Sequence, residues 1–409
     1  MRHELRIRTA REDDVERLIA IHMAAFPDGR NRDARRRNFL ENMRGPLSDL
    51  YVAESGGALL AHAFMFRMAS WFGGSELAVG GIASVGVAPE ARGKGVARAL
   101  MSALLAELQQ RQTPLCLLYP FRHHFYGKLG FATVSEVKRV RIPTGALPTQ
   151  PNDIVLRAAT RPEDFALARR CYERYAEQHT GLIVRRETLW RALFTLEGRH
   201  LTLATTPGGE VVGYSMHGYL WPPEGMPQEI DVMEMIAETD SARLALYGFF
   251  KRQRDQSSYV RLLLDARDPL LAFVDEPRSA SFDAIRTLIP IAGEVGAGAM
   301  LRMIDIPHAL TARGYLRDGA LSLRIHDRDT KAPLFSGTLR VEKGRAQIQP
   351  GALGPTLATD VATLTQLYAG YIRTADAVRY GRAHVDRAET LAIADALFDV
   401  PPFFTLDYF

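Results

Sequence analysis

The chain contains one pattern of predicted elements twice, and this repeat limits the folds that it can adopt. Residues 5–26 and 154–172 each start with a short strand pattern and continue into a helix pattern that has acidic residues in its first turn. Residues 49–67 and 200–219 are each typical of two strands joined by a pair of glycines, which predicts a β-hairpin. We therefore predict two copies of one β–α–β–β unit.

The length of 409 residues is too great for one hydrophobic core, so several domains are expected. We predict that the first copy spans residues 1–150 and that the second copy spans residues 151–290. Residues 291–409 form a third region, with strand patterns such as 334–342 and an apolar helix pattern at 359–371. The mixture of strands and helices in all three regions predicts an α/β (α+β) fold.

The two copies differ where their third element, a strand, meets a helix. In the first copy, a strand pattern ends before Pro89, and the run Arg92-Gly93-Lys94-Gly95 leads into an apolar helix from about Val96. Glycines allow positive φ angles and close approach of the backbone, and the first amides of a helix attract anions. The second copy has no loop glycines there and carries Glu238 and Asp240 instead. The first copy is therefore predicted to bind a phosphate group, and the second to be structural or to shape a cleft.

Three motifs of the first copy resemble those of the GCN5-related N-acetyltransferases. The run Arg92-Gly93-Lys94-Gly95-Val96-Ala97 fits the family signature (Q/R)xxGx(G/A), which binds the pyrophosphate of acetyl-CoA. The strand from Ser84 to Val87 is similar to the bulged strand whose amides hold the pantetheine arm and polarise the thioester carbonyl. The segment Phe125-Tyr126-Gly127-Lys128-Leu129-Gly130-Phe131 looks like the closing motif (F/Y)YxxxGF.

The order of the three regions resembles one subfamily, the Eis-type (enhanced intracellular survival) acetyltransferases. This resemblance implies two fused acetyltransferase-like domains, the second degenerate, and a C-terminal domain similar to sterol carrier proteins. It also implies a homohexamer, acetyl-CoA as co-substrate and no metal. The first-copy motifs are specific, whereas the later regions match by order and character.

The resemblance also assigns roles to individual residues. It places a catalytic acid at Tyr126 and a catalytic base at the α-carboxylate of Phe409, the last residue of the chain. The cofactor contacts that it implies are Ser84, Val85, Gly86, Val87, Arg92, Gly93, Lys94, Gly95, Val96, Ala97, Arg98, Phe121 and Arg122. A base is needed because an alkylamine has a pKa of ~10.4 and must lose a proton to attack a thioester.

Other interpretations of these residues stay open. Tyr126 is also compatible with an interior aromatic side chain, and Tyr119 is a less favoured acid. The aromatic tail at residues 403–409 is also compatible with docking for stability alone. A rival function is a lipid- or acyl-CoA-binding carrier that uses the third region. We expect the carrier hypothesis to weaken if the tail packs toward the first copy and closes the mouth of that cavity.

Composition excludes several classes of protein. The net charge of +4 is too small to indicate nucleic-acid binding, and no apolar run approaches ~18 residues, so no membrane span is expected. The N-terminus is charged and has no signal-peptide pattern, which favours a cytoplasmic location. The two cysteines, Cys116 and Cys171, form neither a disulfide framework nor a zinc motif, and the adjacent His123 and His124 lack metal-ligand spacing.

The acceptor is expected to be a primary amine of an aminoglycoside, a polyamine or a lysine side chain. In the best-known members of the family an acid near the position of Phe26 helps to hold polycationic substrates, and its absence puts aminoglycosides in doubt. Asp28, Asp33 and Glu41 are possible substitutes. The run 35–37, three arginines, is expected to be a solvated helix face.

Overall fold

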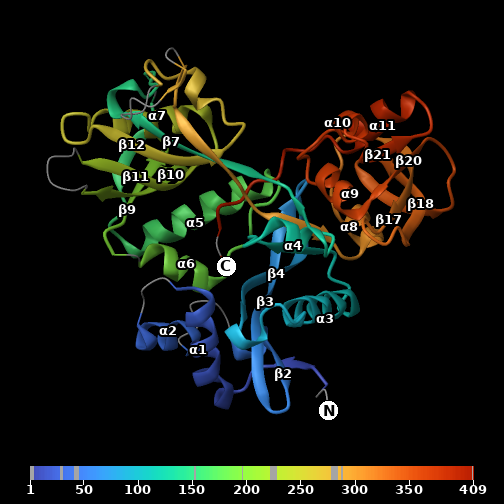
Figure 1. Ribbon diagram of the computed structural model, residues 1–409. Coiled ribbons are helices and arrows are strands. Elements are labelled where there is room, and N and C mark those ends of the chain that lie inside the picture. Colours follow the sequence, from blue (N-terminus) through green and yellow to red (C-terminus); the bar gives the residue numbers. More distant parts are fainter. Residues whose placement is uncertain are drawn as a thin grey trace. The chain divides into compact units, whose positions relative to one another are not determined.

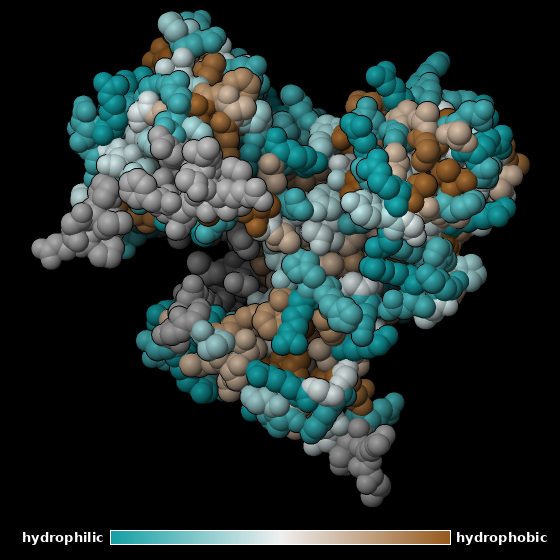
Figure 2. Space-filling view, turned by 45° about the horizontal axis from the view of Figure 1, so that its top comes forward, coloured by the Kyte–Doolittle hydropathy of each residue, from teal (hydrophilic) through white to brown (hydrophobic). Residues whose placement is uncertain are grey.

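The structure is a computed structural model. It describes residues 4–27, 31–40, 46–151, 153–195, 197–221, 228–277, 284–286, 289–407 and 409. The chain divides into two compact units, each assembled from separate stretches of sequence. The first unit comprises residues 1–135, 179–188 and 298–409, and the second comprises 136–178 and 189–297. Figure 2 shows that hydrophilic residues cover much of one face of the molecule.

The first unit contains a mixed sheet of seven strands that belongs mainly to the first copy (Figure 1). Its order is β1 (Arg6–Thr9), β2 (Leu50–Ser55), β3 (Ala58–Phe72), β4 (Ser75–Val87), β5 (Leu115–Leu118), β16 (Met300–Met303) and β6 (Ala132–Thr133). The first four strands are antiparallel, and β4 and β5 are parallel. Strand β16 is distant in sequence and pairs with both β5 and β6.

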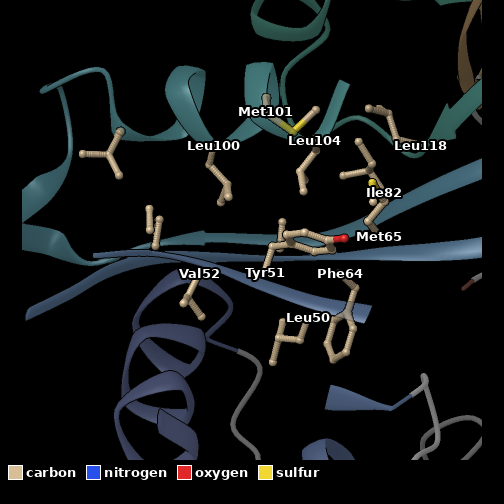
Figure 3. Close-up of a cluster of buried hydrophobic side chains, with 14 of the residues drawn as sticks. Leu50, Tyr51, Val52, Phe64, Met65, Ile82, Leu100, Met101, Leu104 and Leu118 are labelled. Atoms are coloured by element: carbon tan, nitrogen blue, oxygen red, sulfur yellow. The ribbon is translucent and has the colours of Figure 1, made fainter. Parts of the chain in front are cut away.

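Four helices accompany this sheet: α1 (Val15–Ala25), α2 (Arg32–Leu40), α3 (Val96–Gln110) and α4 (His123–Gly127). Helix α3 buries an apolar side that includes Leu100, Met101 and Leu104. Figure 3 shows these three side chains pointing from α3 toward the strands, while Leu50 and Val52 lie on the α1 side of the sheet. Both faces of the sheet are therefore covered, and the core sits in two layers around it.

The third region forms a second sheet within the same unit. Its order is β19 (Arg345–Pro350), β18 (Pro333–Glu342), β17 (Gly319–His326), β20 (Thr356–Asp360) and β21 (Ala383–Val385). Its helices are α8 (Ile306–Ala312), α9 (Val361–Tyr368), α10 (Thr374–Arg379) and α11 (Glu389–Leu397). One buried cluster joins side chains of this region to Phe72, Leu77 and Leu115 of the first sheet, so the two sheets of this unit share a core.

The second unit has its own seven-stranded sheet. Its order is β15 (Gly293–Ala297), β7 (Glu136–Pro143), β12 (Tyr259–Asp265), β11 (Glu229–Ala237), β10 (Val211–Leu220), β9 (His200–Thr205) and β8 (Val155–Ala158). The associated helices are α5 (Pro162–Glu177), α6 (Glu187–Phe194) and α7 (Asp240–Lys251), and a short pair, β13 (Ala284–Arg286) and β14 (Ile289–Pro290), stands apart from the sheet. Among the described helices, none is long and apolar enough to cross a bilayer.

The core of the first unit gives a stability prediction. Leu104 is completely buried, so Leu104→Ala is expected to destabilise this unit by ~2–5 kcal/mol through lost apolar contact and the cavity left behind. The measurement is urea unfolding followed by circular dichroism, with Ser102→Ala on the exposed side of α3 as the control. Equal unfolding midpoints for the two variants would contradict this assignment of the core.

Candidate active site

Strand β4 carries a bulge at the residues predicted to contact the cofactor. Phe64 of β3 pairs with Ala83, but His62 pairs with Gly86, so Ser84 and Val85 together face one residue of β3. Ser84 has a φ of 51°, in the left-handed region that non-glycine residues rarely adopt. An extra residue in one strand leaves backbone groups outside the regular ladder. The bulge therefore interrupts the regular ladder at the residues predicted to contact the cofactor.

Strands β4 and β5 stop pairing just before the bulge. Their parallel ladder runs only from Val79 with Leu115 to Ile82 with Leu118. Beyond it, β4 continues to Val87, whereas the chain after β5 leaves through Tyr119 and Pro120 toward α4. The facing edges of β4 and β5 are thus not paired with each other at their carboxyl ends. Open α/β sheets commonly bind ligands at such a place.

The loop after β4 has the backbone conformation that its glycines allow. Gly93 and Gly95 have φ angles of 73° and 80°, and a Cβ atom at either position would meet no atom within 4 Å. The need for glycine therefore comes from the backbone angle, and the space beside the loop is open. Gly95 is the N-cap of α3, which begins at Val96. The fit to a pyrophosphate is good: an open, glycine-lined helix N-terminus.

The cations around this loop have different environments. Arg92 donates hydrogen bonds from Nη2 to the carbonyl of Ala24 at 2.8 Å and from Nε to the carbonyl of Val87 at 3.3 Å. It thus ties the loop to the end of α1 and to β4. Lys94 and Arg98 are exposed. Their charges add to the positive end of the helix dipole.

Tyr126 lies on α4, the short helix after β5. Its ring is 6% exposed and packs edge-on against Phe125 and Phe131, with centroid distances of 5.0 and 6.1 Å. Burial raises the pKa of the Tyr126 phenol to about 12, so the phenol is protonated at neutral pH. Just before α4, Phe121 is 79% exposed and the Arg122 guanidinium lies 5.5 Å from its ring centre.

The end of the chain returns to the first sheet. The ring of Phe409 meets Phe66 of β3 edge-on, with centroids 6.2 Å apart, and lies 6.0 Å from Tyr119. A Cβ atom at Gly81 of β4 would come within 2.9 Å of the Phe409 ring. Gly81 pairs with Leu117, one residue before the β4–β5 ladder ends. The last residue of the chain therefore lies where β3, β4 and the exit of β5 meet.

Two buried features around the site were not predicted from the sequence. His62 is completely buried under the bulge, where a Cβ atom at Gly86 would lie 2.6 Å from its Nε2. Its ring stacks on His22 at 5.4 Å, and desolvation, with a smaller effect of His22, lowers the pKa of His62 to about 3. The second feature is an ion pair between Arg185 and Asp407. No sequence pattern links residues so far apart.

The prediction of a solvated arginine face at residues 35–37 was wrong for Arg35. This residue is 5% exposed, and its guanidinium lies 3.0 Å from His22 Nε2 and donates to the carbonyl of Phe26 at 3.0 Å. Arg35 thus fastens α2 to α1. Of the acids considered for acceptor binding, Asp33 is exposed, and Asp28 and Glu41 lie outside the described residues. No group of three or more His, Cys, Asp or Glu side chains in the described residues is placed to hold a metal ion.

The second copy has a different junction at the corresponding position. Glu238 forms an ion pair with Arg174 at 2.6 Å, and the Thr239 side chain accepts a hydrogen bond from the amide of Ala242, capping α7. Side chains of the protein therefore satisfy this helix start, and an acid stands where a phosphate would have to sit. This geometry favours the hypothesis that only the first copy binds the phosphate group.

Comparison with known proteins agrees with the order of these regions. Acetyltransferase (GNAT) domain models match residues 6–134 and 181–302, and a sterol carrier protein domain model matches residues 306–405. The chain is 24% identical over 349 residues to N-acetyltransferase Eis of Mycobacterium tuberculosis, covering 80% of this chain and 79% of that protein. Together the two GNAT models cover more than half of the chain, so the chain belongs to the GNAT acetyltransferases.

Other proteins are similar to this GNAT acetyltransferase over most of its length. An uncharacterized N-acetyltransferase of Streptomyces griseus is 28% identical over 352 residues, which is 80% of each chain. Among solved structures, a GCN5-related N-acetyltransferase from Anabaena variabilis has a TM-score of 0.83 at 21% identity, covering 98% of this chain and 99% of that one. Eis1 from Mycobacterium abscessus has a TM-score of 0.76 at 22% identity, with the same coverage. These structures show the shared fold.

The contact between Gly86 and His62 gives a binding prediction. In Gly86→Ala the added methyl group would press on the buried imidazole and displace the bulge. We expect the KM for acetyl-CoA to rise by about tenfold, the effect of ~1.4 kcal/mol of lost binding. The assay is release of the CoA thiol, with Gly354→Ala as the control because a Cβ atom there meets no atom within 4 Å. An unchanged KM in Gly86→Ala would refute a role of the bulge in cofactor binding.

Proposed function

We propose that this GNAT acetyltransferase transfers the acetyl group of acetyl-CoA directly to a primary amine within a ternary complex. The backbone amides of Val85 and Val87 would polarise the thioester carbonyl. The loop and helix start from Arg92 to Arg98 would bind the pyrophosphate, and Phe121 and Arg122 would lie along the cofactor. Acetyl-CoA supplies the activated acetyl group, and the residues of the chain position it and move the protons.

In this proposal the α-carboxylate of Phe409 is the base. The position of the Phe409 ring carries the proposal, because Phe66, Gly81 and Tyr119 hold it at the end of the β4–β5 ladder. A carboxylate there would lie near the point where an amine approaches a thioester held by the bulge. An ammonium nitrogen has no lone pair, so the acceptor first loses one proton to solvent. The carboxylate then accepts a second proton, directly or through one water molecule, as the neutral nitrogen attacks the thioester.

Tyr126 is the acid in this proposal. The departing CoA thiolate needs a proton, and a phenol whose pKa is raised to about 12 still carries one at neutral pH. Phe409 takes one proton from the attacking neutral amine and Tyr126 gives one proton to the thiolate, so the transfer step is balanced. Proton exchange with solvent then returns both groups to their starting states. The proposed acceptors are an aminoglycoside, a polyamine or a lysine side chain. A cytoplasmic location and a homohexamer are proposed from the family resemblance.

The alternative function, a lipid or acyl-CoA carrier, is less well supported. Phe403 is completely buried in the core that the third region shares with the first sheet, and its ring lies 5.9 Å from Phe72. The tail is thus packed between the third region and the first sheet, where a carrier would need an opening. This packing favours the enzyme.

A change at the end of the chain tests the base. Two residues added after Phe409 would convert its carboxylate into a neutral peptide carbonyl and move the terminal carboxylate two residues further on. The kcat for amine acetylation is therefore expected to fall by ~10²-fold or more. Binding of acetyl-CoA, measured by calorimetry, should persist. The matched control is the same two residues added before Met1. Normal turnover of the C-terminally extended enzyme would remove the carboxylate from the mechanism.

A second change tests the acid. Tyr126→Phe keeps the buried ring but removes the proton donor, so kcat should fall by ~10²-fold. Because burial raises the pKa of Tyr126, the kcat of the unmodified enzyme should not fall as the pH rises through the ordinary tyrosine pKa of about 10. Steady-state rates with an amine acceptor check both points. An unchanged kcat in Tyr126→Phe would show that another group protonates the thiolate.

A further inference from the structure

A short segment between α5 and α6 belongs to the first compact unit although its flanks belong to the second. The segment comprises residues 179–188, and its residues 181–184 run antiparallel to the end of β3, with a bridge between Ile183 and Ser70. The backbone hydrogen bonds join Gly181 N to Trp71 O at 2.8 Å, Trp71 N to Leu182 O at 3.0 Å and Val184 N to Ala69 O at 2.9 Å. This segment is therefore fixed to the strand that carries Phe66.

The same segment holds the C-terminal tail from its other side. The amide of Phe404 donates to the carbonyl of Thr180 at 2.9 Å. Gly181 has a φ of 100°, and a Cβ atom there would lie 2.8 Å from the Phe403 ring, so the tail packs directly on this glycine. Arg185 then pairs with Asp407, with Nε to Oδ1 at 2.9 Å and Nη2 to Oδ1 at 2.7 Å.

The ion pair between Arg185 and Asp407 lies two residues before the end of the tail. Their side chains are 3% and 5% exposed, so separating them would leave charges unpaired in a poorly solvated place. Two residues span at most about 7 Å, whereas six span about 20 Å. A fixed Asp407 therefore confines Phe409 far more closely than the contacts at Phe403 alone would.

We propose that Arg185 is a positioning residue that holds the Phe409 carboxylate in the active site through Asp407. The second copy would then contribute to catalysis through residues 179–188. Its strand-to-helix junction at Glu238 is not suited to bind a phosphate group. This inference rests on the proposed role of Phe409 as base. Arg185 itself touches neither substrate nor the reacting atoms in this scheme.

The test compares Arg185→Gln and Asp407→Asn with Arg141→Gln, which breaks the ion pair of Arg141 with Glu229 in the second unit. Loss of the tail anchor should lower kcat by about tenfold or more through lost positioning, with the KM for acetyl-CoA within about twofold. Arg185→Lys, which keeps the charge, should recover part of kcat. A role in folding alone would not produce this split between kcat and KM. Arg141→Gln should leave kcat unchanged.

A second readout does not require catalysis. Carboxypeptidase A removes C-terminal aromatic residues, and it should release Phe409 faster from Arg185→Gln and Asp407→Asn than from the unmodified protein or Arg141→Gln. Release at the unmodified rate from both anchor variants would overturn the inference. If the C-terminally extended enzyme turns over normally, the proposed base fails, yet this release assay still decides whether Arg185 holds the tail.

The unmodified enzyme provides a test if the anchor variants do not fold. Hydrogen exchange should show the amides of Trp71, Gly181 and Phe404 protected to a similar degree, because they belong to one set of contacts. Exchange of the Phe404 amide without protection, beside a protected Trp71, would contradict a tail held by this segment.

Discussion

The structure depends on where two parallel strands stop pairing. The β4–β5 ladder ends at Ile82 and Leu118, the bulge begins at Ser84, and the glycine loop follows within ten residues. An open sheet offers its backbone groups to a ligand only where neighbouring strands are unjoined. The residues proposed to act on acetyl-CoA lie on β4, on the loop after it, in the first turn of α3, or between the end of β5 and α4. The fold thus concentrates the chemistry at one break in one sheet.

The second copy retains the arrangement of strands and helices, but the polar side chains at its strand-to-helix junction bind other groups of the protein. Glu238 pairs with Arg174, and Thr239 caps α7. Its sheet also takes in β7, which directly follows the first copy in sequence, while the first sheet takes in β16 from beyond residue 298. Such exchange makes each sheet dependent on remote segments of the chain. A copy that has no phosphate loop can therefore be retained for its structural contribution.

Local patterns predicted the features that arise from nearby residues. The hairpins, the loop glycines and the start of α3 at Val96 depend on residues close in sequence, and they were predictable for that reason. The tail at Phe409 was placed in the site only by family resemblance. The pair of Arg185 with Asp407, separated by 222 residues, and the burial of His62 under Gly86 depend on tertiary packing that no local pattern encodes. Arg35 was mispredicted for the same reason. Its guanidinium contacts His22 and the carbonyl of Phe26, and a run of three arginines does not indicate such contacts.

In the proposed mechanism, the negative charge of the Phe409 α-carboxylate takes the proton from the amine. The most direct measurement compares semisynthetic enzyme that ends in the Phe409 α-amide with the same enzyme that ends in the α-acid. The amide keeps the ring contacts with Phe66 and Tyr119 and removes only the carboxylate. A fall in kcat of ~10²-fold or more, with unchanged binding of acetyl-CoA, is the predicted result. Equal kcat values for the two forms would contradict it.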